Sequence, residues 1–150
     1  MPEKETLERA TEDKREGKSP STQAGEFVRE EIEHIREGKH GARSAKQAIA
    51  IGLSKARRAG VKLPAPGKGQ ASKGARKQAA RDLRKGGKRS RKVSAKRSRA
   101  TSRALKREGH SAASKTALSR HAHAAAKKRS AASRSKAAKK AARTRKHNRS

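Results

Sequence analysis

The stretch from Pro20 to Pro64, PSTQAGEFVREEIEHIREGKHGARSAKQAIAIGLSKARRAGVKLP, decides the fold of this 150-residue chain. It holds most of the large apolar residues, in a sequence where only 29% of residues are hydrophobic and 38% are charged. A chain with so few apolar residues and so much charge cannot order its whole length around a packed core. We therefore expect one small folded part, built on the large apolar residues of this stretch: Phe27, Val28, Ile32, Ile35, Ile49, Ile51, Leu53, Val61 and Leu63.

A first helix is predicted over about residues 22–37. The start signal Ser19-Pro20-Ser21 precedes it, and Gly38 supplies the left-handed residue that commonly ends a helix. Its apolar positions follow the i, i+4, i+7 spacing of a single helix face. These positions are Val28, Ile32 and Ile35.

A second helix is predicted over about residues 45–59. Ser44, with Gln47 three residues later, forms a capping box, which satisfies free backbone donors at the start of a helix. Gly60 and Val61 are placed to close the helix with a Schellman motif. The apolar stripe of this helix consists of Ala45, Ala48, Ile49, Gly52, Leu53 and Ala56.

The link over residues 38–43 is short enough to return the second helix against the first, so residues 20–64 are predicted to form a helical hairpin. A unit of about this size, without disulfides or metal, usually needs oligomerisation or a partner for stability. A homodimer through residues 20–64 would meet this need.

The segments around the hairpin are predicted to lack a core of their own. Residues 1–19 are interpreted as an acidic-mixed, flexible leader, because they offer no apolar face. Residues 65–71 are a Pro/Gly linker, and residues 72–150 are a low-complexity tail rich in Ala, Ser, Lys and Arg. We expect this intrinsically disordered tail to be largely unstructured alone, or helical only when phosphates neutralise its charge. Its candidate helices run from Ser72 to Gly86, from about 95 to 107, and from Ser111 or Ser114 toward 143.

The charge of the chain is strongly positive and unevenly distributed. Residues 1–37 contain 11 acidic and seven basic residues, whereas residues 38–69 contain eight basic residues and no acid. Residues 70–150 contain 29 Lys and Arg residues against two acids, Asp82 and Glu108. Such one-sided charge is typical of a protein that binds a polyanion.

The sequence lacks the residues and motifs that secreted, membrane, metal-binding and nucleotide-binding proteins require. The absence of cysteine excludes disulfides and thiolate metal sites. No apolar run approaches the length of a transmembrane helix, and the polar N-terminus does not resemble a signal peptide, so we expect a cytoplasmic protein. His121 and His123 lack the i, i+4 spacing of paired metal ligands, and Lys68 lacks the Ser or Thr that follows it in a P-loop. We therefore predict a protein that is not an enzyme, with no cofactor and no metal site.

The basic tail predicts largely sequence-independent binding of double-stranded DNA by phosphate neutralisation, with compaction or bridging of the DNA. Single strands are disfavoured, because Phe27 is the single aromatic residue and no stacking platform exists. The predicted contacts are the densest basic clusters: Arg84, Lys85, Lys88, Arg89, Arg91, Lys92, Lys127, Lys128, Arg129, Lys139 and Lys140. Secondary candidates, from the second helix, are Lys46, Lys55, Arg57 and Arg58.

Two other functions stay open on the sequence. One is a basic protein associated with RNA or the ribosome, because Arg-rich extensions also bind RNA. The other is a plasmid-maintenance protein that acts through a protein partner bound by residues 20–64.

Two segments resemble known families. Residues 107–150, with Ala-Ala-Lys-Lys and Ala-Ser-Arg-Ser-Lys-Ala-Ala-Lys-Lys-Ala-Ala, resemble the tails of linker histones and the histone-like basic proteins of bacteria. The winged-helix domain of linker histones is not visible in residues 1–64. Residues 29–60 are similar to a short bacterial family sometimes labelled plasmid-stabilisation or DNA-binding proteins. These resemblances imply a bacterial, nucleoid-associated DNA-binding protein and assign no catalytic residue.

Overall fold

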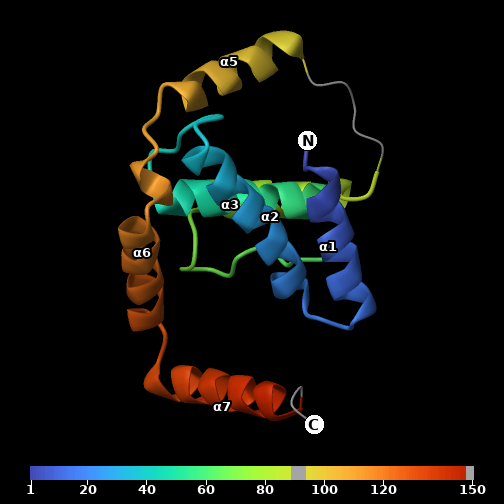
Figure 1. The fold of residues 1–150 in the computed structure, drawn as a ribbon, viewed down its shortest axis with the longest axis vertical. Coiled ribbons are helices and arrows are strands. Elements are labelled where there is room, and N and C mark those ends of the chain that lie inside the picture. Colours follow the sequence, from blue (N-terminus) through green and yellow to red (C-terminus); the bar gives the residue numbers. More distant parts are fainter. Residues whose placement is uncertain (89–93, 148–150) are drawn as a thin grey trace. The chain divides into compact units, whose positions relative to one another are not determined.

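The structure is a computed structural model that describes residues 1–88 and 94–147 (Figure 1). These residues form seven α-helices and one 3₁₀ turn, η1, so the prediction of a mainly α fold is confirmed. Within the same two ranges, no helix combines the length and the apolar character needed to span a membrane. The elements are α1 Lys4–Arg15, α2 Pro20–Arg36, α3 Ala45–Arg58, α4 Lys73–Lys85, α5 Ala95–Lys106, η1 Ser111–Ala113, α6 Lys115–Lys127 and α7 Ala131–His147.

The chain divides into two compact units, Met1–Ser114 and Lys115–Ser150. The first unit contains α1 to α5 and η1, and it holds the buried residues of the described chain. The second unit contains α6 and α7, neither of which has a buried residue.

Serine side chains begin the helices where the sequence predicts that they should. The Oγ atoms of Ser19, Ser44 and Ser72 each accept a hydrogen bond from a backbone N–H of the first turn of α2, α3 and α4, at 3.2 to 3.3 Å. A cap of this kind stabilises a helix by roughly 1 kcal/mol. The reciprocal half of the predicted capping box is shifted by one residue, because the side chain of Gln47 accepts from the N–H of Arg43 at 2.7 Å.

Glycines with a positive φ end the first three helices. The N–H of Gly38 donates to the Ile35 carbonyl, and the next N–H, of Lys39, donates to His34, which is the Schellman arrangement. Gly60 closes α3 in the same way, as predicted, with the Val61 N–H donating to the Ala56 carbonyl. Gly17 closes α1 by the same pattern.

The hairpin of α2 and α3 is the centre of the first unit (Figure 1). The two backbones approach closely at Gly52, where a Cβ atom would lie 2.7 Å from the Cα of Val28. Small residues permit this approach, and Phe27 fills the space beside it with 1% of its surface exposed. The cluster of buried residues at this centre consists of Ala10, Ala24, Phe27, Ala56 and Val61, with Leu53 and Leu63 packed against it.

Residues 1–19 differ from the flexible leader that the sequence suggests, because α1 packs against α2. Thr6, Ala10 and Asp13 are its buried residues, at i, i+4 and i+7. These side chains are small or polar, so they form a buried face without large apolar residues. Arg9 further links α1 to α2 through a 2.7 Å ion pair with Glu26.

The last turn of α5 and the segment after it dock on the turn between α2 and α3. The N–H of Gly41 donates to the Leu105 carbonyl at 2.9 Å, and the N–H of Ala42 donates to the Gly109 carbonyl at 3.0 Å. A Cβ on Gly41 would collide with the backbone of Glu108, so only glycine fits there. The segments Arg36-Glu37-Gly38-Lys39-His40 and Arg107-Glu108-Gly109-His110-Ser111, which share an Arg-Glu-Gly sequence, also meet here, because a Cβ on Gly38 would lie 3.8 Å from the imidazole of His110.

The expectation of a largely disordered tail is wrong for the residues that the structure describes, because α4 to α7 occupy most of residues 72–147. Ala, Lys and Arg are strong helix formers, and this propensity outweighs the repulsion between neighbouring charges. The helix expected from Ser111 or Ser114 toward residue 143 is divided, because α6 ends at Lys127 and Ser130 caps the start of α7.

Candidate nucleic-acid interface

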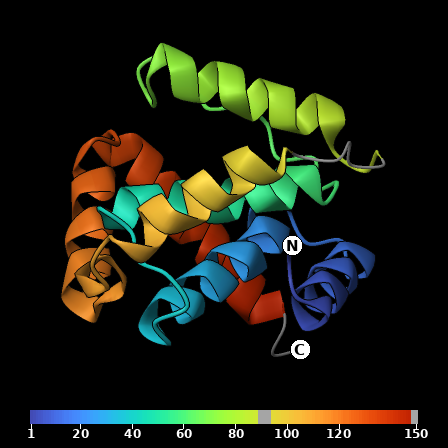
Figure 2. The same ribbon diagram turned by 90° about the horizontal axis from the view of Figure 1, so that it is seen from above.

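Helix α4 has a buried face and an opposite, cationic face. Ala79 and Asp82 are its buried residues, and α4 runs alongside α3, as Figure 2 shows. The basic residues recur at i, i+4, i+8 and i+11, which places them together on the solvent side of the helix. All four are exposed, and they are Lys73, Lys77, Arg81 and Arg84.

Asp82 fixes the orientation of this cationic face. The hydroxyl of Ser54, on α3, donates a 2.5 Å hydrogen bond to Asp82, and the side-chain amide of Gln78 donates another at 3.0 Å. Arg58 lies 3.8 Å from the same carboxylate. Asp82 is 4% exposed, so its negative charge is buried beside Ser54, Gln78 and Arg58. It therefore does not reduce the positive charge of the outer face of α4.

Helices α5 and α7 carry comparable stripes of basic residues. In each helix the residues repeat at intervals of three and four, so their charges share one side. Neither helix contains an acidic residue or a buried residue. The stripes are Lys96, Arg99, Arg103 and Lys106 on α5, and Lys136, Lys139, Lys140 and Arg143 on α7.

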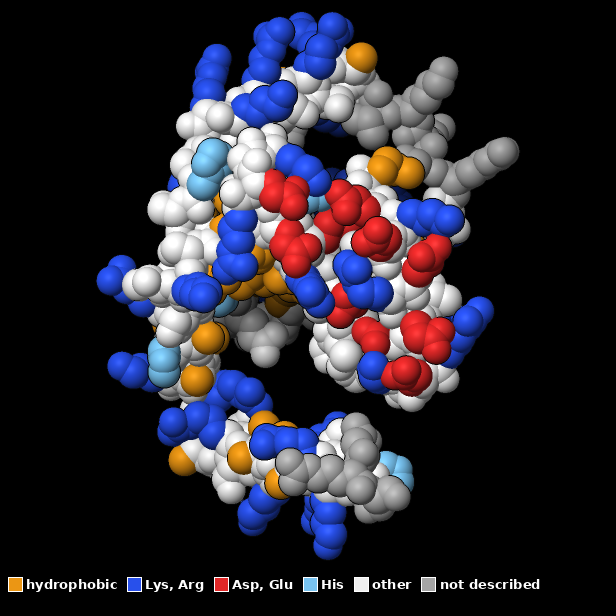
Figure 3. Space-filling model, in the orientation of Figure 1, with side chains coloured by type: hydrophobic (Ala, Val, Ile, Leu, Met, Phe, Trp, Pro, Cys, Tyr) orange, Lys and Arg blue, Asp and Glu red, His pale blue; other side chains and the backbone are white. Residues whose placement is uncertain are grey.

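The acidic residues lie elsewhere in the first unit. Asp and Glu side chains gather over α1 and α2, as Figure 3 shows, and many of them pair with Lys or Arg of the same two helices. Beyond residue 69 the acids are Asp82 and Glu108, and Glu108 lies 3.5 Å from Arg43. Both of these acids therefore have cationic neighbours within the first unit.

The predicted contact clusters are exposed wherever the structure describes them. Arg84, Lys85 and Lys88 lie at the C-terminal end of α4, next to the end of α3, where the Gly87 N–H donates to the Arg58 carbonyl at 3.3 Å. The predicted contacts in the second unit are exposed as well, and they are Lys127, Lys128, Arg129, Lys139 and Lys140. Arg89, Arg91 and Lys92 lie outside the described residues.

The secondary candidates on α3 divide into two kinds. Lys46 and Arg58 are exposed and remain able to reach a phosphate. Arg57 is 5% exposed and donates to the carbonyls of Leu63 and Pro64, at 3.1 and 3.0 Å. Burial lowers the pKa of the Arg57 guanidinium from its ordinary value. Arg57 therefore holds the chain that follows α3 and is not placed for a ligand.

Lys55 is also committed to internal contacts. Its Nζ lies 2.7 Å from Glu31 Oε2 and 3.3 Å from Glu30 Oε1, and both carboxylates are buried. Desolvation acts to raise the pKa of Glu30, but hydrogen bonds from the Glu3 N–H and Thr6, together with Lys55, lower it overall. Lys55 thus serves the interface between α2 and α3.

Dense clusters of adjacent charges in the sequence do not include several basic residues of the cationic faces. Lys73, Lys77 and Arg81 are each separated from the next by three residues, so they are not adjacent to one another in the sequence. Their four-residue spacing is the signal that could have found them, because it aligns them on a helix that Ser72 begins.

The interface has no aromatic surface. Phe27 is the single aromatic residue of the sequence, and it is buried in the core. Base stacking is therefore not part of what this surface can do, whereas contacts with phosphates need only the exposed cations.

The fold and these surfaces define a small, mainly helical protein with cationic helix faces. Residues 13–68 match the sequence model of DUF6496, a family of unknown function. The match runs from the end of α1 through α3 and stops before α4, so it covers less than half of the chain. No curated protein and no solved structure matches the chain.

Proposed function

We propose that the protein binds double-stranded DNA through its phosphates, largely independently of sequence, and compacts or bridges the DNA. The observation that carries the proposal is the surface of residues 70–88 and 94–147, where exposed Lys and Arg line α4, α5 and α7 and where Asp82 and Glu108 have cationic neighbours within the protein. Each contact between such a cation and a phosphate releases counterions and favours binding.

The burial of Phe27 supports a duplex ligand. Proteins that prefer single strands or RNA loops stack bases on exposed aromatic side chains, which this chain lacks. Helices with long rows of Lys and Arg suit the regularly spaced phosphates of a duplex.

The division into two units supports bridging. The first unit carries the cationic faces of α4 and α5, and the second carries that of α7. The second unit contains 13 Lys and Arg residues and no acid. Two basic units on one chain can hold two duplex segments, and a protein acting in this way would associate with the nucleoid.

The proposal is tested by fluorescence anisotropy of full-length protein with duplex DNA, duplex RNA and single-stranded DNA over a range of salt concentrations. We expect the tightest binding to duplex DNA, little dependence on base sequence, and a linear fall of log affinity with log salt. Preference for duplex RNA over duplex DNA would instead favour the RNA-associated function, and binding that is independent of salt would exclude phosphate neutralisation.

A further inference from the structure

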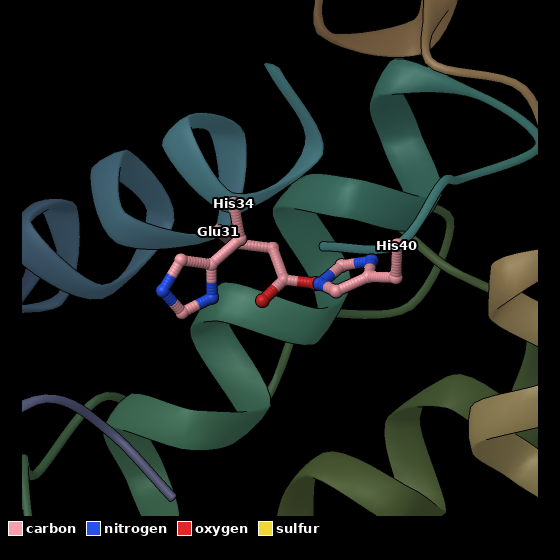
Figure 4. A group of neighbouring side chains, drawn as sticks. All are labelled: Glu31, His34 and His40. Atoms are coloured by element: carbon pink, nitrogen blue, oxygen red, sulfur yellow. The ribbon is translucent and has the colours of Figure 1, made fainter. Parts of the chain in front are cut away.

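Three side chains with the chemistry of metal ligands meet where α2 ends. Glu31 and His34 come from α2, and His40 comes from the turn that follows it. One ligand atom from each lies within 4.8 Å of the other two. Figure 4 shows the Glu31 carboxylate between the two imidazole rings, with one ring nitrogen of each histidine turned toward it.

The outer nitrogen of each imidazole has a partner that fixes the ring. Nε2 of His34 lies 2.8 Å from a carboxylate oxygen of Glu3, and Nδ1 of His40 lies 3.1 Å from the carbonyl oxygen of Gly41. When these nitrogens carry the protons, His34 Nδ1 and His40 Nε2 are left as lone-pair donors. Histidine ligands of metal ions are held in this manner by carboxylates and backbone carbonyls.

Glu31 supplies a buried negative charge to the group. Its side chain is 1% exposed, and neither carboxylate oxygen has a hydrogen-bond partner of good geometry. Lys55 lies beside Oε2 at 2.7 Å, but it is shared with the buried carboxylate of Glu30. Oε1 faces His40 Nε2 at 3.4 Å. Two buried carboxylates for one ammonium leave this site with an excess of negative charge, which is a favourable setting for a cation.

We propose that Glu31, His34 and His40 bind one divalent transition-metal ion, with Zn²⁺ as the representative ion. Two imidazole nitrogens and a carboxylate oxygen are ligands that zinc and its first-row neighbours accept. Two ligand atoms that are each about 2.1 Å from an ion lie at most about 4.2 Å apart. Small side-chain rotations would bring the three ligand atoms, which now lie within 4.8 Å of one another, to this separation. This site is separate from the cationic faces that carry the proposed DNA binding.

The side chains of His34 and His40 are 13% and 17% exposed, which gives an ion a path from the surface. An ion here would join α2 to the turn at residues 39–44. Gly41 and Ala42 of that turn bind the segment after α5, so the ion would also steady the docking of residues 105–109.

The test uses full-length protein that has been treated with a chelator and dialysed. Zinc chloride is titrated by calorimetry, and cobalt chloride is followed by visible absorption. We expect one ion per chain and a Co²⁺ spectrum of a four- or five-coordinate site. Substitution His40→Gln, in a turn and without a role in the core, is expected to weaken Zn²⁺ binding at least about tenfold.

A second variant and a matched control separate a metal site from general loss of structure. Glu3→Gln leaves all three ligands in place and is expected to weaken binding about 10- to 100-fold, because Glu3 orients His34. The double variant His121→Gln, His123→Gln removes two histidines of α6 and is expected to bind as the original protein does. Absence of a stoichiometric ion, or a Zn²⁺ affinity in the His40→Gln and Glu3→Gln variants equal to that of the original protein, would overturn the proposal.

Discussion

The hydroxyl of Ser54, on α3, donates a 2.5 Å hydrogen bond to the buried carboxylate of Asp82, on α4. This bond joins residues 28 positions apart and places the basic row of α4 on the outside of the first unit. Asp82 is therefore a structural residue in a basic region.

Replacement of Asp82 by alanine is expected to destabilise the protein by about 1 to 3 kcal/mol, because the Ser54 hydroxyl and the Gln78 amide lose a buried acceptor. Denaturant unfolding followed by circular dichroism measures this change. Faster amide exchange in residues 73–85 should accompany it. Glu108→Ala is the matched control, because it removes the same charge from an exposed ion pair with Arg43, and a loss as large as that of Asp82→Ala would contradict the account.

Replacement by alanine of two glycines of the hairpin, Gly52 and Gly25, should change the stability of the protein in opposite directions. At Gly52 a Cβ would press on the Val28 backbone, so Gly52→Ala is expected to cost about 1 to 3 kcal/mol. At Gly25, within α2, nothing lies within 4 Å of the added Cβ. Gly25→Ala is therefore expected to stabilise the protein by about 0.5 to 1 kcal/mol, as a better helix former. Thermal unfolding compares the two, and stabilisation by both substitutions would show that the helices do not cross closely at Gly52.

Substitutions of the neighbours Arg57 and Arg58 should differ in their effect on the free energy of unfolding and on DNA binding. Arg57→Gln is expected to lose about 1.5 to 3 kcal/mol of stability, because the carbonyls of Leu63 and Pro64 lose a charged donor. The side chain of Arg58 is 59% exposed, so Arg58→Gln should change stability by less than about 1 kcal/mol. Urea unfolding and the salt dependence of DNA binding are measured for both. A lower salt slope for Arg57→Gln in a folded protein would be evidence against its structural role.

Local signals in the sequence predict the ends of the helices well. Ser19, Ser44 and Ser72 begin helices because a cap needs only the neighbouring backbone, and Gly38 and Gly60 end them for the same reason. These signals act within one turn of helix, so they can be read without knowledge of the tertiary structure.

The packing of the first unit was harder to predict, because it depends on residues far apart in the chain. The buried face of α1 is made of Thr6, Ala10 and Asp13, none of which is a large apolar residue. Lys55 and Arg57 resemble ligands for phosphate until Glu30 and the Leu63 carbonyl are brought beside them. The high net charge suggests disorder in the basic tail, but the helix propensity of Ala, Lys and Arg prevails in α4 to α7.

The pairing of His34 with His40 is likewise hard to predict from the sequence, because it depends on the tertiary structure. The sequence directs attention to His121 and His123, which are close in the chain, whereas His34 and His40 meet because the turn after Gly38 folds back on α2. The i, i+4 spacing rule for paired histidine ligands assumes one regular helix, and this group combines a helix with a turn.

The central claim is that oriented cationic helix faces, and not net charge alone, carry the binding of DNA. Two full-length variants with equal net charge test it by fluorescence anisotropy across salt. One replaces Lys73, Lys77, Arg81 and Arg84 of α4 with Gln, and the other replaces Lys4, Lys14, Arg15 and Arg29 of α1 and α2 with Gln. We expect the slope of log affinity against log salt to fall by up to about 3 to 4 in the α4 variant and to stay nearly unchanged in the other. Equal weakening by the two variants would contradict the account.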